Sequence, residues 1–443
     1  MSKTFWTGFL LLFVLTIANT LAFVDRQVIS LLVDPIRDTI GATDIEIGLL
    51  QGLAFALLFA VFGLPAGRLV DTQNRKLILA GGIMVWSLAT IACGTMGSFA
   101  GLFMARIFVG VGEATLAPAA YSMIADQFDK RVLGRALAVY QSGIYLGSAI
   151  AFIGGGILFQ NASEAGSLTV PLLGELNAWQ QVFVIVGLPG FAAVILIAFL
   201  KEPERKSRSA PPSLGKVFAY IRHHFAAYGW MTIGMAAFGS LGYGLNAWAP
   251  AAAERTFGLA TDIVGRGLGI AVLGGSLSGI IVGGLLADSL ATRHGGHMRL
   301  VLLMIAGILI APIAFFAATA SQPRTALMAT GLLFFLAAMP FSAGVAALQA
   351  ITPSAMRGQI SALYYATALV LAIIIGPALP PIVSTVFLDG DASIGLALAW
   401  TMAALGLIGT ICLGFAISGY RRFPADVDAA ILPSVRSAPD LGS

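Results

Sequence analysis

Apolar segments about 20 residues long recur along the whole chain, separated by short polar stretches. A helix needs about 20 predominantly apolar residues to cross the hydrocarbon core of a bilayer. Only 10% of the residues are charged, against about 25% in soluble domains. The sequence therefore predicts an all-α membrane protein with twelve transmembrane helices. They lie near residues 6–33, 46–69, 75–97, 100–126, 134–160, 179–200, 225–251, 263–288, 298–320, 325–352, 358–386 and 394–420.

The charged residues between these spans are divided unequally between the two sides of the membrane. If both termini are cytoplasmic, the cytoplasmic segments hold 19 Lys/Arg and 9 Asp/Glu, whereas the opposite side holds 4 and 10. An excess of Lys and Arg is typical of cytoplasmic loops. We therefore expect a multi-pass protein of the cell (inner) membrane with cytoplasmic termini. The net charge of +4 reflects this topology, so it does not indicate a nucleic-acid partner.

A charged segment at residues 201–224 divides the chain into two halves of six spans each, 1–200 and 225–420. The tail after Tyr420 is polar and contains proline, so residues 421–443 are predicted to be a disordered cytoplasmic tail.

The later part of the linker reads "SLGKVFAYIRHH". It can form a short helix with Val217, Phe218 and Ile221 on the headgroup boundary. A plain linker is the alternative.

The two halves repeat a motif at a cytoplasmic helix end, six spans apart. "GRLVDTQNRK" follows the second span and carries Gly67, Asp71 and Arg75, and "GLLADSLATR" follows the eighth and carries Asp288 and Arg293. Internal repeats of this kind are typical of transporters whose halves rock around a central site.

These motifs carry a resemblance to a known family. "GRLVDTQNRK" resembles the loop motif of the major facilitator superfamily, and "RIFVGVGEA" resembles its fourth-helix motif. "NTLAFVDRQVISLLVDPIRDTIG", "GLLQGLAFALLFA" and "RIFVGVGEATLAPAAYSMIAD" look like the Spinster branch, in its bacterial form. The loop motif departs from the usual form at Thr72 and Asn74. The resemblance implies two pseudo-symmetric six-helix bundles that transport by alternating access.

Four charged residues fall inside the predicted spans: Asp25, Arg26, Arg106 and Glu113. A charged side chain at the bilayer centre costs at least about 2.5–3.5 kcal/mol, and such residues usually serve function. Two carboxylates and two guanidiniums make a neutral set. At a rise of about 1.5 Å per residue, Asp25 and Arg106 lie at a similar depth, roughly 7–10 Å from the midplane towards the outer side.

The resemblance places the first and fourth helices side by side, so we expect an ion pair between Asp25 and Arg106. A carboxylate that leaves its arginine partner for an apolar setting takes up a proton. We therefore predict proton coupling through Asp25, Arg106 and Glu113, and the resemblance implies the same role. A static buried ion pair is the alternative for this set. Arg26 is expected to contact a substrate or lipid headgroup.

Other polar residues in the spans are candidates for substrate binding. With Arg26, the predicted set comprises Asn19, Tyr121, Asn246 and Tyr365. The seventh span reads "LGYGLNAWAP", in which two glycines loosen the helix and Pro250 ends or kinks it. This segment is a candidate outer gate.

The repeated loop motifs are assigned a different role. In the superfamily such groups hold neighbouring helices and the other half together when the cytoplasmic side is closed. Gly67, Asp71, Arg75, Asp288 and Arg293 are therefore expected to form a conformational latch that does not touch substrate.

The expected function is secondary active transport of a small amphipathic or lipid-like solute, since animal Spinster proteins are associated with lysolipids and sphingosine phosphates. An uncoupled facilitator and a multidrug or organic-anion carrier remain open. A membrane enzyme is disfavoured because all four histidines lie in connecting segments and Cys93 and Cys412 lie in apolar runs. We expect no cofactor and no metal site, and a monomer whose partners are substrate, protons and the lipid bilayer.

Overall fold

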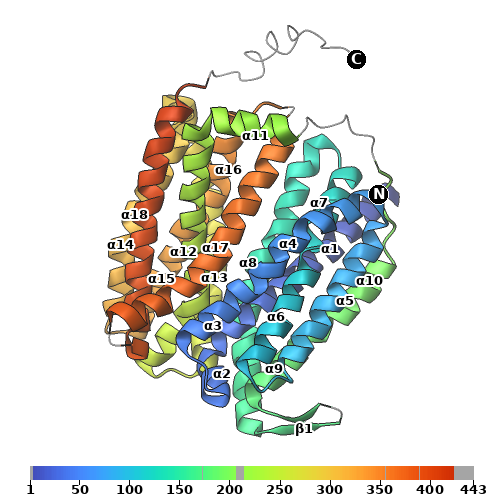
Figure 1. The fold of residues 1–443 in the computed structure, drawn as a ribbon, viewed down its shortest axis with the longest axis vertical. Helices are drawn as coiled ribbons and strands as arrows, with labels where there is room; N and C mark the ends of the chain where they lie inside the picture. The colour runs from blue at the N-terminus through green and yellow to red at the C-terminus, as the bar shows by residue number, and fades with distance from the viewer. Residues whose placement is uncertain (1–2, 172, 206–213, 355, 389, 424–443) are drawn as a thin grey trace.

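The computed structural model of the chain describes residues 3–171, 173–205, 214–354, 356–388 and 390–423. Helices dominate these residues (Figure 1). The β-structure among them is one antiparallel hairpin, formed by β1 (Leu168–Val170) and β2 (Gly174–Leu176).

The first half of the chain forms a helical bundle, called here the N-terminal bundle. Its helices are α1 (Lys3–Gln27), α2 (Val33–Ile40), α3 (Asp44–Gln51), α4 (Leu53–Thr72), α5 (Arg75–Cys93), α6 (Phe99–Glu113), α7 (Leu116–Gln127), α8 (Lys130–Ala165), α9 (Ala178–Gly187) and α10 (Pro189–Ala198). A 3-10 turn, η1 (Val28–Leu31), continues α1. Helix α1 packs along α8, and α5 packs against α6, α9 and α10.

The second half forms the C-terminal bundle. Its helices are α12 (Phe225–Phe257), α13 (Thr261–His294), α14 (Met298–Thr319), α15 (Pro323–Ala338), α16 (Pro340–Ala350), α17 (Arg357–Phe387) and α18 (Ile394–Tyr420), with a 3-10 turn, η2 (Gly390–Ser393), before α18. Helix α12 packs against α17 and α18, and α13 packs against α15.

Eleven helical segments of the described residues are long and apolar enough to cross a membrane, and they coincide with eleven of the twelve predicted spans. The remaining predicted span is α12, which has 33 residues. Glycine, serine, tyrosine and asparagine interrupt its apolar sequence. These residues are tolerated because α12 packs against several helices of the bundle and about half of its residues are buried.

The later part of the linker forms a helix, α11 (Leu214–His223). Of the two predicted alternatives, a short helix and a plain linker, the structure has the helix. Val217 is fully buried against the C-terminal bundle, whereas Phe218 is exposed. The segment thus packs partly on protein, and its apolar side chains do not all lie on the headgroup boundary. Residues 424–443 of the predicted tail lie outside the described residues.

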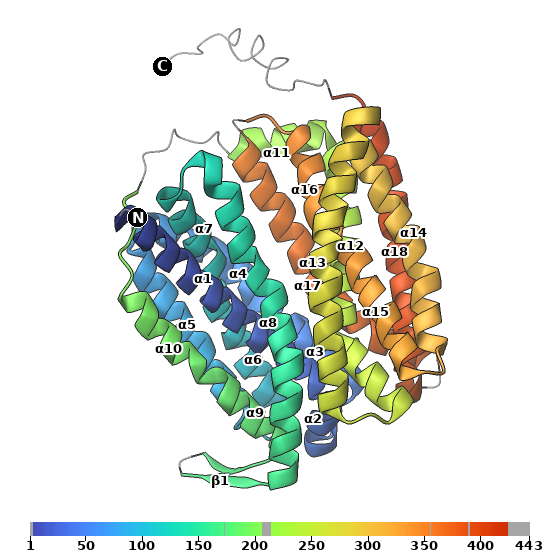
Figure 2. The same cartoon turned by 180° about the vertical axis from the view of Figure 1, so that it is seen from behind.

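The two ends of the molecule can be named from its elements. The linker side carries α11, the start of α1 and the end of α18, and the hairpin side carries β1, β2 and α2 (Figure 1). The two bundles lie against each other at the hairpin side and diverge towards the linker side (Figure 2).

Close contact between the bundles is made by small residues. A Cβ atom on Gly52, between α3 and α4, would lie 2.5 Å from the carbonyl oxygen of Ile373 on α17. A Cβ on Gly265 of α13 would lie 2.2 Å from the carbonyl oxygen of Phe152 on α8. Small residues let helix backbones approach in this way in membranes. These glycines therefore fix the closed hairpin side.

Prolines do not end the long helices of the C-terminal bundle. Helix α12 continues past Pro250 to Phe257. Of the two predicted alternatives, that Pro250 ends or kinks the helix, the first is therefore wrong. In α17, Pro381 has no N–H to donate to the carbonyl oxygen of Pro377. The indole Nε1 of Trp248 donates to that oxygen instead, at 2.7 Å. A neighbouring helix thus supplies the donor that the proline removes.

Candidate functional site

Of the four charged residues predicted inside the membrane, three are buried and the side chain of Arg26 is 9% exposed. Asp25 and Arg26 lie in the last turn of α1, and Arg106 and Glu113 lie on α6. The exposed fractions of Asp25, Arg106 and Glu113 are 3%, 0% and 2%. Helix α6 ends at Glu113 and α7 starts at Leu116, and Ala114 and Thr115 between them keep right-handed helical dihedral angles. Glu113 therefore lies at a local irregularity of one span, Phe99–Gln127.

Arg26 is the residue that connects this group to the opposite bundle. Its Nη2 forms an ion pair with Oε2 of Glu113, and its Nη1 donates to the hydroxyl of Tyr243 on α12 over 3.4 Å. The guanidinium also lies over two aromatic rings, 4.6 Å from the centre of Phe23 and 4.2 Å from that of Phe55. Cation–π contacts strengthen when they are desolvated. Arg26 is therefore a central member of the site in this conformation, and its side chain is buried away from lipid headgroups.

The predicted ion pair between Asp25 and Arg106 is not formed among the described residues. The guanidinium of Arg106 donates from Nη1 to the backbone carbonyl of Asp25, at 3.2 Å. The Asp25 carboxylate accepts a hydrogen bond from the hydroxyl of Thr90 on α5, at 3.2 Å. The last carbonyl groups of a helix have no hydrogen-bond donor within the helix. Arg106 supplies such a donor to the carbonyl of Asp25 in the last turn of α1. The match in depth was correct, but the backbone of Asp25 is the partner.

Several buried polar atoms of the site have no hydrogen-bond partner among the described residues. They are Nε and Nη2 of Arg106, Oε1 of Glu113, Nε of Arg26 and Oδ1 of Asn246. Buried polar atoms are nearly always hydrogen-bonded, so each exception needs an explanation. Here three N–H donors and two acceptors remain available to a bound solute or a proton.

The other predicted substrate residues fall into two groups. Asn19 is 4% exposed and donates to the backbone carbonyl of Tyr140, at 2.9 Å, so it joins α1 to α8. Asn246 on α12 donates to the carbonyl of Gly242 and keeps Oδ1 free among the described residues. Tyr121 and Tyr365 come from opposite bundles, are more than a third exposed, and interact electrostatically with each other. Asn19 therefore has a helix-packing contact, whereas the other three retain free polar groups or exposed surface.

Arg75, from the first loop motif, is fully buried on the linker side of the N-terminal bundle. Its Nη1 lies 2.5 Å from Oδ2 of Asp126 on α7, and its Nε donates to Oε1 of Glu202, at 3.0 Å. It also donates to Ser122 and to the carbonyl of Pro203. Arg75 thus joins α5, α7 and the segment after α10 within one bundle.

The other loop-motif residues lie at the linker-side ends of their helices. Asp71 is exposed, and its backbone carbonyl accepts a hydrogen bond from Arg205. Gly67 has open space where a Cβ would lie. Asp288 pairs with Arg299 at 3.0 Å, and Arg293 is exposed. In this conformation the exposed charges of the two motifs do not pair across the bundles among the described residues.

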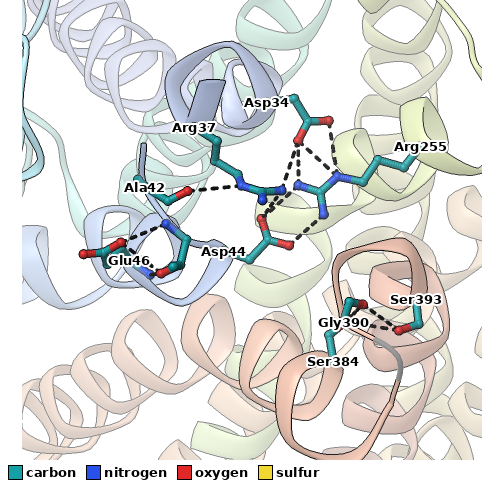
Figure 3. Close-up of polar contacts among 10 residues, drawn as sticks. Asp34, Arg37, Ala42, Asp44, Glu46, Arg255, Ser384, Gly390 and Ser393 are labelled. Atoms are coloured by element: carbon teal, nitrogen blue, oxygen red, sulfur yellow. Dashed lines mark hydrogen bonds and ion pairs between the residues drawn. The ribbon is translucent and has the colours of Figure 1, made fainter. Parts of the chain in front are cut away.

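A cluster of four charged residues joins the bundles at the hairpin side, and sequence reasoning missed it. We call Asp34, Arg37, Asp44 and Arg255 the hairpin-side cluster (Figure 3). Arg255, near the end of α12, contacts Asp34 on α2 at 2.6 Å and Asp44 on α3 at 2.7 Å. Arg37 contacts Asp44 at 3.0 Å. Burial and the two carboxylates act oppositely on the pKa of Arg255, and the carboxylates prevail and raise it.

Local structure places these carboxylates. Thr43 caps α3 in a capping box with Glu46, which sets Asp44 in the first turn of that helix. Asp34 lies in the first turn of α2. Carboxylates are stabilised near helix N-termini. The signal in the sequence was that Arg255 is one of only four basic residues assigned to an otherwise acidic side.

No group of three or more His, Cys, Asp and Glu residues that could hold a metal ion occurs in the described part of the chain.

Known proteins resemble this chain over its whole length or over part of it. An MFS-type efflux pump of Mycolicibacterium smegmatis is 27% identical over 422 residues, which are 92% of this chain and 92% of that protein. Protein spinster of Drosophila melanogaster is 29% identical over 192 residues, 43% of this chain and 29% of that protein.

The fold is shared with a solved structure of a bacterial homologue of the human lysosomal transporter Spinster, in an inward-facing and unoccupied conformation. The TM-score is 0.81 and the sequence identity 23%, over 96% of this chain and 98% of that one. The family description "Major Facilitator Superfamily" matches residues 15–377. The chain therefore belongs to the Major Facilitator Superfamily and is a multi-pass membrane transporter, not an enzyme.

Proposed function

We propose that this protein is a proton-coupled transporter that moves a small amphipathic solute by alternating access. The observation that carries the proposal is the buried group of Asp25, Arg26, Arg106 and Glu113, which contains unpartnered donors and acceptors and contacts both bundles. Intramembrane ionisable groups are costly and are retained for function.

Alternating access is supported by the asymmetry of the two ends. The bundles contact each other through the hairpin-side cluster and through glycines of α13 and of the α3–α4 junction, whereas they diverge towards the linker side (Figures 1 and 2). We assign the linker side to the cytoplasm, because it carries the basic loops. The structure then represents an inward-facing state, and the outer side is the closed one.

The loop motifs fit a latch that acts in the opposite state. Asp71, Asp288 and Arg293 lie on the linker side with exposed side chains. Asp288 pairs with Arg299 in this conformation and would change partner if the charges of the two motifs meet when that side closes. Arg75 stays within its own bundle and gives the latch a rigid base.

Proton coupling follows from the contacts of Arg26. Its guanidinium holds Glu113 and reaches Tyr243 of the opposite bundle. A proton on Glu113 would neutralise the carboxylate and remove half of the ion pair, which frees Arg26 to change partners. A ligand that binds two conformations unequally shifts their populations, and here the proton is that ligand. Asp25, which contacts Thr90 and lies beside Arg106, is the second carboxylate able to carry a proton.

The unpartnered N–H groups of Arg106 suit an anionic or strongly polar headgroup, since arginine presents several donors in a fixed plane. Tyr121, Asn246 and Tyr365 add polar groups near the junction of the bundles. We therefore propose a lipid-like amphipath with a small headgroup as the solute. A multidrug or organic-anion carrier is the second candidate, because the efflux pump of M. smegmatis resembles this chain over nearly its whole length.

Transport by purified protein in proteoliposomes tests the proposal. Three fluorescent probes are compared: a lysophospholipid with an anionic headgroup, the same molecule with a zwitterionic headgroup, and the hydrophobic cation ethidium. We expect faster movement of the anionic lysophospholipid than in protein-free liposomes. Movement of ethidium alone would favour the multidrug candidate, and movement of none of the three would contradict the proposed solute class.

A further inference from the structure

We propose that Glu254 is a second proton-binding site, separate from Asp25 and Glu113, and that a proton bound there keeps the hairpin side of the transporter closed. The inference rests on the alternating access proposed above, but it does not depend on which buried carboxylate couples transport.

Glu254 lies at the contact between the two bundles. It precedes Arg255 in α12 and lies beyond the predicted span at 225–251. Its Oε1 is buried and has no hydrogen-bond partner among the described residues. Thr261 at the start of α13 favours the ionised form of the Glu254 carboxyl group, and Asp34 on α2 disfavours it. One oxygen of this carboxyl group is therefore buried without a hydrogen-bond donor among the described residues.

The charges around Glu254 do not balance when it is ionised. The groups that face it are Arg255 on its own helix and Asp34 from the opposite bundle, and through them Arg37 and Asp44. Two guanidiniums then oppose three carboxylates. With a proton on Glu254, the remaining two carboxylates match the two guanidiniums. The closed arrangement is therefore neutral only when Glu254 is protonated.

Burial raises the pKa of Glu254 to about 7, and the carboxylate of Asp34 adds to this effect, whereas Thr261 and Arg255 partly oppose it. Asp34 belongs to the N-terminal bundle, so opening of the hairpin side removes its repulsion and lets water reach the carboxyl group. In the open state the pKa of Glu254 returns towards its ordinary value. The closed state thus binds the proton more tightly. Protonation of Glu254 therefore stabilises the closed state fully at pH values below the open-state pKa. This stabilisation is lost as the pH rises through about 7, the closed-state pKa.

Distance measurements across the hairpin side test this inference. Nitroxide labels are attached at Ser163→Cys, at the end of α8, and at Ser321→Cys, between α14 and α15. Both serines are exposed. They belong to different bundles, so the distance between the two labels reports the separation of the bundles. The native Cys93 and Cys412 are buried. The full chain is labelled in lipid nanodiscs without substrate, and distances are recorded from pH 5 to pH 8.

We expect the ratio of closed to open hairpin side to fall at least about tenfold between pH 5 and pH 8 in the otherwise unaltered chain. In Glu254→Gln the hairpin side should stay closed across this range. The matched control is Glu175→Gln, which neutralises an exposed glutamate in β2 on the same side, and it should keep the full pH response.

An unchanged pH response in Glu254→Gln would overturn the inference. If Glu113→Gln abolished the response instead, the proposed coupling site would stand and the Glu254 site would fall. If Glu254→Gln abolished the response while transport by Asp25→Asn and Glu113→Gln stayed proton-driven, the coupling site would fall and the Glu254 site would stand. A helix-disrupting effect of the substitution is checked with Glu254→Asp, which should retain a pH response.

Discussion

Replacing Arg106 by methionine is expected to reduce transport by about two orders of magnitude or more. Arg106 is fully buried, donates to the backbone carbonyl of Asp25 near the end of α1, and keeps two unpartnered nitrogen atoms for a solute. Without Arg106, the set has two carboxylates, Asp25 and Glu113, and one guanidinium, Arg26, so its charges no longer balance. Removing one partner from a buried charged group costs about 3–5 kcal/mol, and each 1.4 kcal/mol corresponds to about a tenfold change. Initial rates in proteoliposomes measure this effect.

Arg106→Lys separates charge from geometry in this prediction. A lysine keeps the positive charge but lacks the planar set of donors. We expect intermediate rates for Arg106→Lys if the headgroup needs several donors. Rates equal to those of the unaltered chain in both variants would remove Arg106 from the transport site.

Replacing Arg75 by methionine is expected to destabilise the N-terminal bundle by about 3–5 kcal/mol, because the buried Asp126 would lose its ion pair with Arg75. Arg75 has no exposed surface, and its partners come from α7 and from the segment after α10. Thermal unfolding of the purified protein in detergent measures the change as a lower midpoint.

Arg68→Met is the matched control, since Arg68 belongs to the same loop motif but is exposed. Surface substitutions usually change stability by less than about 0.5 kcal/mol. Equal midpoints for Arg75→Met and Arg68→Met would show that the buried Arg75 contacts do not hold the bundle together.

The architecture was predictable because apolar length and charge asymmetry are properties of single segments. Eleven spans coincide with helices of sufficient length and apolar character. The span at α12 could be predicted but not its continuity past Pro250, because a proline is tolerated where neighbouring helices pack closely. The hydrogen bond from Trp248 to Pro377 shows how α12 and α17 adapt to each other.

The buried charges were also predictable, since charges are rare inside spans, but their partners were not. Depth along the membrane can be counted from the sequence, whereas the rotation of each helix about its axis cannot. Asp25 and Arg106 therefore meet, but through a backbone carbonyl. Arg26 pairs with Glu113 of α6, and it also reaches Tyr243 because α12 of the opposite bundle contacts the end of α1 at η1.

The hairpin-side cluster illustrates contacts that no local pattern reveals. Asp34, Asp44 and Arg255 are ordinary loop charges in the sequence, and more than 200 positions separate Arg255 from the other two. They become one site only when the two bundles close on that side. The outer gate predicted in α12 stays a prediction, and the structure adds contacts between Arg255 at the end of α12 and the opposite bundle.

The central claim is that a proton gradient drives transport through Asp25 and Glu113. Its most direct test is accumulation of the anionic lysophospholipid probe in proteoliposomes with an imposed pH gradient, for the unaltered chain, Asp25→Asn and Glu113→Gln. We predict gradient-driven accumulation in the unaltered chain and its loss in at least one variant, while downhill movement without a gradient persists. Accumulation that is equal in all three proteins would contradict proton coupling through these carboxylates.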